Sequence, residues 1–440
     1  MATLWEDVSL KEREELRGMT FADCVVIGGG LVGIMTAYRL QQRGFSAVVL
    51  EADRVASGAT ARTTAKITSQ HGIIYSKIAR KIGKDYAKLY YESNQRAIDD
   101  FEEIIRREKI DCDFRRVSAY LYSRKSSLPL LNEQMYATNS GAKCTCLRET
   151  ELPFSVKCAL KFENQAQFHP LKFIKPLTRN LEIYEKSPVV FVEDNMVYTA
   201  KGMVKTHYII NTCHYPFINS PGYYFLRQHQ ERSYLLAVNT EKRIDGMYLD
   251  VDSGHTLRNF TGGMLIGGEK HRTGKNKKGG CYCRLEDFAN ELFKDAEVTH
   301  AWSNQDAITH DGLPFIGRFS KKHPNMFVAT GFNKWGMSLS SVASTLIADL
   351  ICSKNSEYER LYTPQRMNIR AGAGEFLKDA GCSAVYLFSG LLSKKERKCT
   401  HLGCRLQKNS DENTWECPCH GSQFDKSGKL NFSPAKRDKD

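Results

Sequence analysis

The sequence predicts an α/β protein with a Rossmann-like core and a small additional domain at its C-terminal end. Three observations support this: a strand that enters a glycine-rich turn and a helix over residues 24–43, a second glycine turn and helix over residues 330–351, and a dense group of cysteines and histidines over residues 399–420. A chain of 440 residues is long enough for two or three domains.

The first feature is a strand–turn–helix unit that suits a dinucleotide. Cys24–Ile27 is an apolar run typical of a buried parallel strand, and it enters GGGLVG (28–33) directly. Gly28 permits the tight turn, Gly30 lets the backbone approach a pyrophosphate, and Gly33 lets the helix pack closely on the sheet. The N-terminal amides of the helix then face the phosphates.

A second strand and an acidic residue complete this unit. Glu51 follows the predicted strand Ala47–Leu50 and lies 18 residues after Gly33, where a carboxylate can accept a hydrogen bond from a ribose hydroxyl. Because every part of the unit is present, a glycine turn without a ligand is the less favoured interpretation. The loop that follows Glu51 supplies small residues, hydroxyl groups and charged groups, which suit an extended, phosphate-bearing cofactor. Its candidate contacts are Arg54, Ser57, Thr60, Thr63 and Thr64.

A ribose-binding carboxylate suits FAD and NAD equally, but the second glycine turn favours FAD. Asp311–Gly317 precedes a predicted strand over Met326–Ala329, and TGFNKWGM (330–337) then leads into a helix with an apolar stripe. Backbone amides at this helix start can face the pyrimidine edge of a flavin, whose reduced form is anionic. The candidate contacts here are Gly331, Gly336 and Met337.

The net charge of +13 raises the question of a nucleic acid or an acidic membrane surface. Residues 367–440 hold 13 Lys/Arg and 9 Asp/Glu, so only +4 of that charge lies there, and the basic clusters are short. A solvated surface is the favoured interpretation, an acidic redox protein the second, and no nucleic-acid partner is expected. No apolar run approaches the roughly 18 residues of a membrane helix, and residues 1–19 lack the apolar core of a secretory signal. A cytoplasmic location is expected.

Ten of the fourteen cysteines are scattered and are expected to be ordinary thiols of a reducing compartment. The other four lie within 21 residues of one another. CTHLGC (399–404) and CPCHGS (417–422) each offer one thiolate and one imidazole. In a Rieske [2Fe–2S] centre one iron takes two cysteines and the other takes two histidines, which fits two such loops meeting at their tips. The predicted ligands are Cys399, His401, Cys417 and His420.

Zinc is the alternative for two cysteines and two histidines. Zinc sites, however, more often place both cysteines on one loop and both histidines on the other. Cys404 and Cys419 also fall at corresponding places in the two loops. This segment resembles Rieske proteins, in which a disulfide fastens the two loops, and the resemblance implies a Cys404–Cys419 disulfide.

Residues 5–366 resemble the FAD-dependent oxidoreductases of the D-amino-acid-oxidase/glycine-oxidase class, especially the bacterial branch fused to a Rieske domain. The matching stretches are TTAKITSQHGIIY (63–75), QFHP (167–170), HYPFIN (214–219), RSYLLAV (232–238), GGEKHRTG (267–274), DGLPFIG (311–317) and TGFNKWGM (330–337). The resemblance implies an α/β Rossmann-like FAD-binding domain with an inserted α+β substrate domain, followed by a small all-β Rieske domain.

The resemblance also sets the expected domain boundaries. An N-terminal segment covers 1–20, the oxidoreductase unit covers 21–366, and the Rieske domain covers 367–440. The expected FAD-binding parts are about 21–80, 165–215 and 300–366, and the substrate-domain parts are about 81–164 and 216–299. Only 32 residues separate Arg366 from Cys399, so fewer strands are expected beneath the cluster loops than the family usually has.

Together, FAD and a [2Fe–2S] cluster predict oxidation of an amine or amino-acid-like small molecule, followed by electron transfer to the cluster one electron at a time. No catalytic nucleophile or acid–base pair stands out. The alternative is an electron-transfer protein that exchanges electrons only with protein partners, and a degenerate structural homologue is the third possibility. By resemblance alone, the substrate-side candidates are His71, His214, Tyr215, Tyr234 and Arg258.

Overall fold

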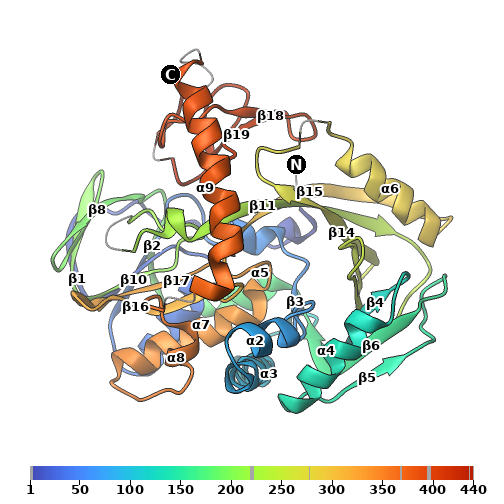
Figure 1. Cartoon of the computed structure of the whole chain (residues 1–440). Coiled ribbons are helices and arrows are strands. Elements are labelled where there is room, and N and C mark those ends of the chain that lie inside the picture. Colours follow the sequence, from blue (N-terminus) through green and yellow to red (C-terminus); the bar gives the residue numbers. More distant parts are fainter. Residues whose placement is uncertain are drawn as a thin grey trace.

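The computed structural model of the chain describes residues 3–218, 222–276, 278–366, 369–393, 398–435 and 437–439. Within these residues the strands form two large sheets and one small sheet (Figure 1). The small sheet lies at the C-terminal end, above the two large ones in this view. Among the described helices, none combines the length and the apolar content needed to cross a bilayer.

The first large sheet is the predicted Rossmann-like sheet, with strand order β16-β17-β10-β1-β2-β7. Strand β1 pairs in parallel with β10 and β2, β2 with β7, and β10 with β17. The hairpin of β8 and β9 is attached to β10. The strand bounds are β1 Gly18–Ile27, β2 Ala47–Leu50, β7 Glu182–Tyr184, β8 Val189–Glu193, β9 Met196–Thr199, β10 Gly202–Asn211, β16 Phe315–Ser320 and β17 His323–Thr330.

Two helices that begin at the predicted glycine turns pack against each other and against this sheet. They are α1 (Leu31–Gln42) and α7 (Gly336–Ile351), and the apolar stripe of α7 is buried as predicted. The other helices beside them are α3 Lys84–Glu108, α5 Pro170–Leu177 and α8 Glu359–Tyr362. Short 3₁₀ turns occur at η1 Leu4–Asp7, η2 Ala59–Arg62 and η3 Tyr224–Leu226.

The second large sheet has the order β15-β11-β14-β13-β12-β4-β6-β3, with β5 paired to β6. Its strands are β3 Lys66–Ile67, β4 Arg115–Ser123, β5 Cys144–Leu147, β6 Cys158–Gln167, β11 Gln228–Asn239, β12 Met247–Asp250, β13 Thr256–Phe260, β14 Gly263–Arg272 and β15 Glu297–Thr309. Helices α2 Tyr75–Lys81, α4 Leu128–Asn139 and α6 Cys281–Leu292 accompany it. Strand β15 was not predicted from the sequence, because polar Ser303–Asp306 interrupts its apolar pattern.

The small C-terminal sheet has the order β18-β19-β20-β21. Its strands are β18 Gln407–Asn409, β19 Thr414–Glu416, β20 Gln423–Phe424 and β21 Leu430–Phe432. A long helix, α9 (Ile369–Leu391), connects the oxidoreductase unit to this sheet (Figure 1). This segment was expected to contribute to an all-β domain. It is helical because its apolar residues recur at helical rather than alternating spacing and no proline interrupts them.

Candidate active site and metal centre

A cavity of about 1620 Å³ lies between the two large sheets. It extends from the first glycine turn, past the start of α7, to the edge of the small C-terminal sheet. The predicted cofactor contacts on its wall are Gly28, Gly30, Glu51, Arg54, Ser57, Thr60, Thr63, Thr64, Gly331, Gly336 and Met337. Thus one cavity collects candidates from both glycine turns.

Gly33 does not line the cavity but is required for the turn that does. A Cβ atom placed on Gly33 would lie 1.9 Å from the carbonyl oxygen of Gly28. Gly28 itself has a φ of +110°, which residues with side chains rarely adopt. The N–H of Leu31, in the first turn of α1, donates to Thr60 Oγ1 at 3.0 Å. These contacts leave the start of α1 facing the cavity.

Glu51 and Arg54 lie beside this turn but are already engaged by the protein. Glu51 Oε2 accepts a hydrogen bond from the Gly29 N–H at 2.6 Å, and burial raises the pKa of this carboxyl. Arg54 forms ion pairs with Glu12 and Glu185, the latter at 3.0 Å. Ser57 Oγ donates to the Arg54 carbonyl at 2.8 Å. Arg54 is therefore a weaker candidate for a phosphate contact than the backbone amides of the turn.

The second glycine turn is strained where it meets the cavity. Gly331, Asn333 and Lys334 have φ values of +73°, +51° and +73°. Trp335, the next residue, stacks on His71 with ring centroids 4.5 Å apart. Both ring nitrogens of His71 are occupied, Nδ1 by the Tyr90 hydroxyl at 2.6 Å and Nε2 by the Thr68 carbonyl at 2.6 Å. Burial lowers the pKa of His71 to about 3, so this imidazole is neutral and serves to position the start of α7.

The other substrate-side candidates separate into two groups. His214, Tyr215 and Tyr234 line the cavity, whereas Arg258 does not. Arg258 is buried behind the wall, where its guanidinium donates to the carbonyls of Thr64 and Asn259. The hydroxyl of Tyr215 and Nε2 of His214 are buried and have no hydrogen-bond partner. Unsatisfied buried polar atoms of this kind on a cavity wall are available to a bound molecule.

Among the charged residues on the same wall that were not predicted as contacts are Lys66, Glu231, Asp306 and Lys334. Burial, with the charge of Arg258 adding to it, lowers the pKa of Lys66 to about 7. Burial raises the pKa of Asp306 to about 6. Burial alone would raise the pKa of Glu231, but His229 and Lys334 outweigh it and lower this pKa to about 2. In the sequence, Lys66 and Lys334 lie within the matching stretches 63–75 and 330–337, and a polar run surrounds residue 306.

The two cysteine–histidine loops close in the same way. In the first loop, the Cys399 N–H donates to the Cys404 carbonyl at 2.9 Å, and the Gly403 N–H donates to the Cys399 carbonyl at 2.9 Å. In the second loop, the Cys417 N–H donates to the Ser422 carbonyl at 2.8 Å, and the Gly421 N–H donates to the Cys417 carbonyl at 2.9 Å. The two six-residue loops thus share one pattern of backbone hydrogen bonds, and they lie next to each other.

The predicted ligands converge between these loops. The rings of His401 and His420 lie with centroids 5.0 Å apart, and the thiols of Cys399 and Cys417 are buried. Nδ1 of His420 is buried and has no hydrogen-bond partner, so its lone pair is available to a metal. Two thiols and two imidazoles are the donor set of a [2Fe–2S] centre with mixed ligation. The residues present fit that cluster.

The predicted disulfide is not formed in this structure. Cys404 and Cys419 are both free thiols. Their sulfur atoms and that of Cys417 lie within 4.8 Å of one another. A Cys404–Cys419 bond therefore stays a prediction.

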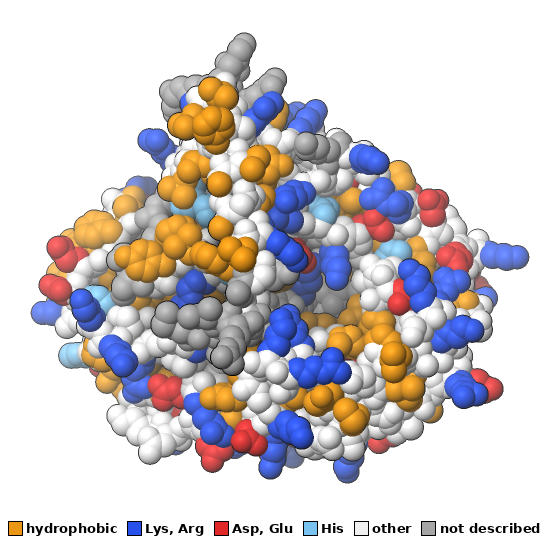
Figure 2. Space-filling view, viewed as in Figure 1, with side chains coloured by type: hydrophobic (Ala, Val, Ile, Leu, Met, Phe, Trp, Pro, Cys, Tyr) orange, Lys and Arg blue, Asp and Glu red, His pale blue; other side chains and the backbone are white. Residues whose placement is uncertain are grey.

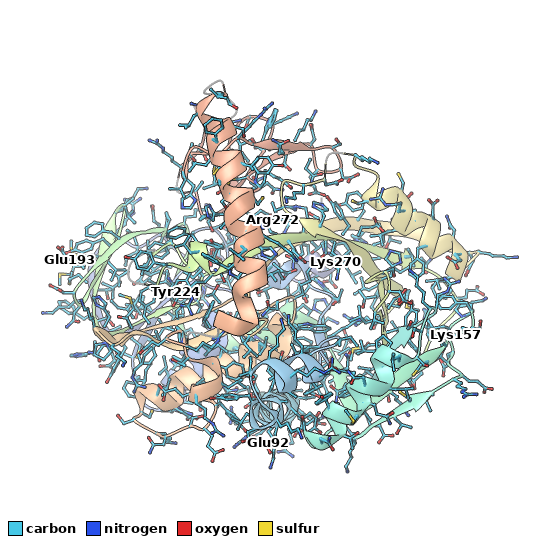
Figure 3. The ribbon with its side chains drawn as sticks, in the orientation of Figure 1. Glu92, Lys157, Glu193, Tyr224, Lys270 and Arg272 are labelled. Carbon is cyan, nitrogen blue, oxygen red and sulfur yellow. The ribbon has the colours of Figure 1, made fainter. Side chains whose placement is uncertain are left out.

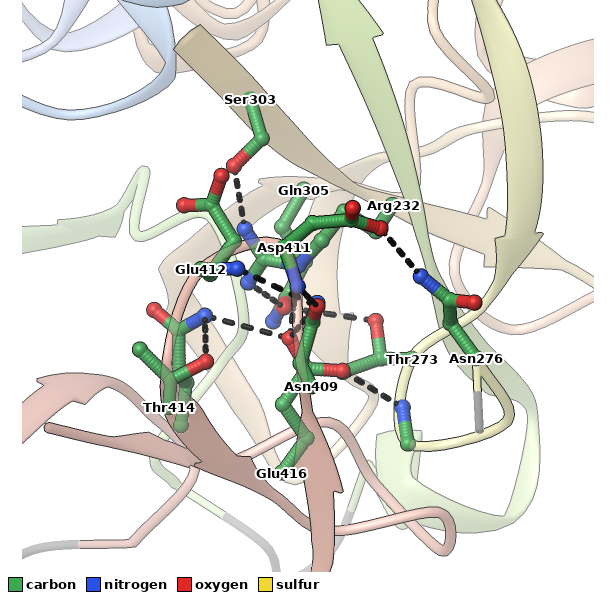
Figure 4. Close-up of polar contacts among 12 residues, drawn as sticks. Arg232, Thr273, Asn276, Ser303, Gln305, Asn409, Asp411, Glu412, Thr414 and Glu416 are labelled. Carbon is green, nitrogen blue, oxygen red and sulfur yellow. Dashed lines mark hydrogen bonds and ion pairs between the residues drawn. The ribbon is translucent and has the colours of Figure 1, made fainter. Parts of the chain in front are cut away.

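The small domain is anchored to strands β11 and β14 through a buried ion pair (Figure 4). Arg232 Nε lies 2.9 Å from Glu416 Oε1, with side chains 1% and 0% exposed. The Gly274 N–H donates to Glu416 Oε2 at 2.8 Å, and Asn409 Nδ2 donates to the Tyr234 hydroxyl at 3.0 Å. Tyr234 thus supports the domain contact as well as the cavity wall.

The second cluster loop is held by its backbone carbonyls. Gln230 Nε2 donates to the His420 carbonyl at 2.7 Å, and Gln305 Nε2 donates to the Gly421 carbonyl at 2.7 Å. Arg272, beside α9 in Figure 3, donates to the carbonyls of Pro418 and Cys419 at 3.0 and 3.1 Å. Glu231, the neighbour of Gln230 on β11, lines the cavity. A single strand therefore connects the cavity to the loop that carries His420.

A dinucleotide cavity bordered by a paired cysteine–histidine loop defines a flavin-dependent oxidoreductase that also carries an iron–sulfur centre. Comparison with known families agrees: the model for FAD dependent oxidoreductases matches residues 23–350, and that for the Rieske [2Fe-2S] domain matches residues 389–438. The chain belongs to this FAD-dependent oxidoreductase family, and its cofactors are FAD and a [2Fe–2S] cluster.

Individual proteins are similar to the whole chain or to part of it. The chain is 34% identical to the Rieske 2Fe-2S iron-sulfur protein YhfW of Bacillus subtilis (strain 168), over 98% of this chain and 96% of that one. It is 27% identical to gamma-glutamylputrescine oxidoreductase of Escherichia coli (strain K12), over 43% and 48% of the two chains. Glycine oxidase from Geobacillus kaustophilus has the same fold, with a TM-score of 0.68, 17% identity, and coverage of 79% of this chain and 99% of that one.

Proposed function

We propose that the chain oxidises an amine or amino-acid-like small molecule and passes the electrons, one at a time, to its Rieske cluster. The observation that carries the proposal is the connection through β11. Gln230 binds the backbone of His420, and the next residue, Glu231, lines the cavity. The relative that acts on gamma-glutamylputrescine supports a substrate with an oxidisable C–N bond.

The residues that would hold the cofactors are those of the two turns and the two loops. For FAD they are the amides at the starts of α1 and α7, with Glu51 at the ribose. Bound there, FAD supplies acceptance of two electrons from the substrate carbon. For the cluster, the proposed ligands are Cys399, His401, Cys417 and His420.

The chain's own residues on the cavity wall would manage the proton. An amine must lose its ammonium proton before it can give up a hydride. Lys66, with a pKa lowered to about 7 by burial and the charge of Arg258, can take a proton at neutral pH. Asp306, with a pKa raised to about 6 by burial, is the second group that can do so. Both lie on the wall of the cavity.

Anaerobic titration tests the proposed electron transfer. We expect amines, amino acids or polyamines to bleach the flavin absorption and then to produce the electron-paramagnetic signal of a reduced Rieske cluster. Rieske potentials of about −150 to +300 mV are high enough for this transfer. A flavin that is reduced without any reduction of the cluster would refute the coupling. A flavin that stays oxidised with every amine, but accepts electrons from protein donors, would favour the electron-carrier alternative instead.

A Cys404–Cys419 disulfide and a cytoplasmic location complete the proposal. Mass spectrometry of the folded, cluster-loaded protein under non-reducing conditions tests the disulfide. Alkylation of both cysteines without prior reduction would exclude it.

A further inference from the structure

Helix α9 makes several polar contacts with the protein on its inward side. Asp379 receives hydrogen bonds from His229 and His310 at 2.9 and 2.7 Å. The Tyr386 carbonyl accepts from the Arg405 N–H at 3.0 Å. Gly390 lies so close to the first cluster loop that a Cβ atom there would be 2.1 Å from the Gly403 carbonyl oxygen. The inward contacts of this helix thus include a carboxylate, a backbone carbonyl and a glycine, together with the rings of Tyr386, which packs on the core of the small domain, and Phe376, which meets His310 edge-on.

The apolar side of α9 faces outward. Its residues lie at positions i, i+4, i+7, i+8, i+11, i+14 and i+15, within an arc of about 120° on a helix of 3.6 residues per turn. All of them are exposed, and the side chains of Leu391 and Leu392 are 71% and 81% exposed. Figure 2 shows hydrophobic side chains gathered over this helix at the top of the molecule. The outward stripe consists of Leu377, Gly381, Ala384, Val385, Phe388, Leu391 and Leu392.

This orientation is the reverse of the usual one for a surface helix, whose apolar stripe faces the core. A large, contiguous apolar patch that is exposed marks a site of contact with another protein or with a membrane. Tyr223 and Leu226 of the η3 region, which packs near α9, are also about half exposed, at 50% and 48%. The apolar surface therefore continues beyond the helix.

The charge near the C-terminal end of α9 identifies what this surface contacts. Lys398 and the exposed Arg405 are paired in a β-bridge, and the Arg405 N–H is bonded to the helix at Tyr386. In the sequence, Ser393 alone separates Leu392 from the run KKERK (394–398). An apolar helical stripe beside basic residues is the composition of segments that lie in an anionic lipid interface. The net charge of +13 opposes self-association and favours an anionic surface.

We infer that α9 docks the protein on the surface of an anionic phospholipid bilayer, with the stripe from Leu377 to Leu392 buried among the acyl chains. The helix would lie in the interface and not span the bilayer. The first cluster loop, which packs on Gly390, would then lie close to that surface. This inference does not depend on the substrate of the flavin site.

Vesicle sedimentation of the full chain, loaded with FAD and cluster, tests the inference. The probes are vesicles of phosphatidylglycerol with phosphatidylcholine and vesicles of phosphatidylcholine alone. We expect binding to the anionic vesicles, weaker binding to the neutral ones, and release as the salt concentration rises. The double variant Phe388→Gln/Leu391→Gln should lower partitioning onto anionic vesicles at least tenfold.

The matched control is Leu128→Gln/Leu131→Gln. This pair has the same i, i+3 spacing on α4, and its side chains are 72% and 48% exposed. The control should bind vesicles as the unchanged protein does. Flavin absorption and the cluster signal establish that each variant is folded. Absence of binding to anionic vesicles, or equal binding by the α9 variant, would overturn the inference. A dimer that the α9 variant dissociates, without vesicle binding, would assign the stripe to a second copy of the chain and also overturn it.

Discussion

The first glycine turn has no room for a side chain at Gly33. Its absent Cβ would lie 1.9 Å from the Gly28 carbonyl oxygen and 2.8 Å from Thr212 Oγ1. Because the first contact is with backbone, Gly33→Ala must displace α1 from the turn that faces the cavity. We expect at least a tenfold loss in FAD affinity and a loss of about 1–3 kcal/mol in the free energy of unfolding. The ratio of flavin to protein absorbance and a denaturant titration measure these effects.

Gly374→Ala is the control for this substitution. Gly374 lies in a helix and has no atom within 4 Å of the position that a Cβ would take. Alanine there should leave the flavin content unchanged and add roughly 0.5–1 kcal/mol of stability. Full flavin occupancy in Gly33→Ala would show that the helix start does not hold the pyrophosphate.

Lys66 gives the proposed reaction its expected pH dependence. Its pKa is lowered to about 7 by burial and by Arg258, and its Nζ donates to the Tyr248 carbonyl at 3.0 Å. Flavin reduction by an amine should therefore accelerate as the pH rises through about 7, where Lys66 loses its proton. Lys66→Met should slow the reduction by about 10²-fold and remove this rise. Lys66→Arg should be equally slow, because a guanidinium does not release its proton. Retention of the rise in either variant, measured by stopped flow, would assign it to another group.

At the scale of elements, the carboxylate of Asp379 makes the buried ion pair that holds α9 to the body. Asp379 pairs with Arg272 of β14. It also bonds to His229 of β11 and to His310, which directly follows β15. We expect Asp379→Asn to loosen α9 and to cost about 3 kcal/mol, because Arg272 would lose its buried partner. Hydrogen exchange of the α9 amides measures this loosening. In Asp349→Asn, which affects a pair with Arg43 whose side chains are each 24% exposed, the loss should be under about 1 kcal/mol.

The elements that the sequence predicts correctly are those whose signal is local. The turn at Gly28 and the apolar stripe of α7 each follow from spacing within a dozen residues. Strand β15 was missed because its polar residues face the cavity and the small domain, which only the tertiary structure shows. The segment of α9 was assigned to a β domain because the family resemblance implied one. For β15 the missing information was the environment of the strand, whereas the helical signal of α9 was present in its own sequence.

At the scale of the whole molecule, the candidate site depends on contacts that no local pattern could predict. The cluster ligands were predicted because each loop contains its own pair. The bonds from Gln230 and Gln305 to the second loop join residues more than 100 positions apart. The charged wall residues Lys66, Glu231, Asp306 and Lys334 come from four separate segments. The two cofactors could therefore be predicted from the sequence, whereas the way in which the protein connects them could not.

That connection depends on the buried pair of Arg232 and Glu416. Burial alone would raise the pKa of Glu416, but the charge of Arg232 outweighs it, and the pKa is lowered from its ordinary value of 4.5. A carboxyl with a lowered folded-state pKa stabilises the fold fully above 4.5, and this contribution is lost as the pH falls below that value. Acid should therefore release the small domain from β11 and β14 before the oxidoreductase unit unfolds.

Glu416→Gln should weaken the docking of the small domain already at neutral pH, because Arg232 would remain buried without a counter-charge. The expected loss in the free energy of docking is about 3–5 kcal/mol. Proteolysis between α9 and β18 and the rate of cluster reduction by the reduced flavin both report whether the domain is docked. The double variant Arg232→Met/Glu416→Met should recover most of the stability, since it removes both charges together. Glu291→Gln, in a pair with Arg124 whose side chains are 44% and 51% exposed, should change neither readout. If Glu416→Gln slowed cluster reduction while the domain stayed protected from protease, the pair would act on the cluster and not on docking.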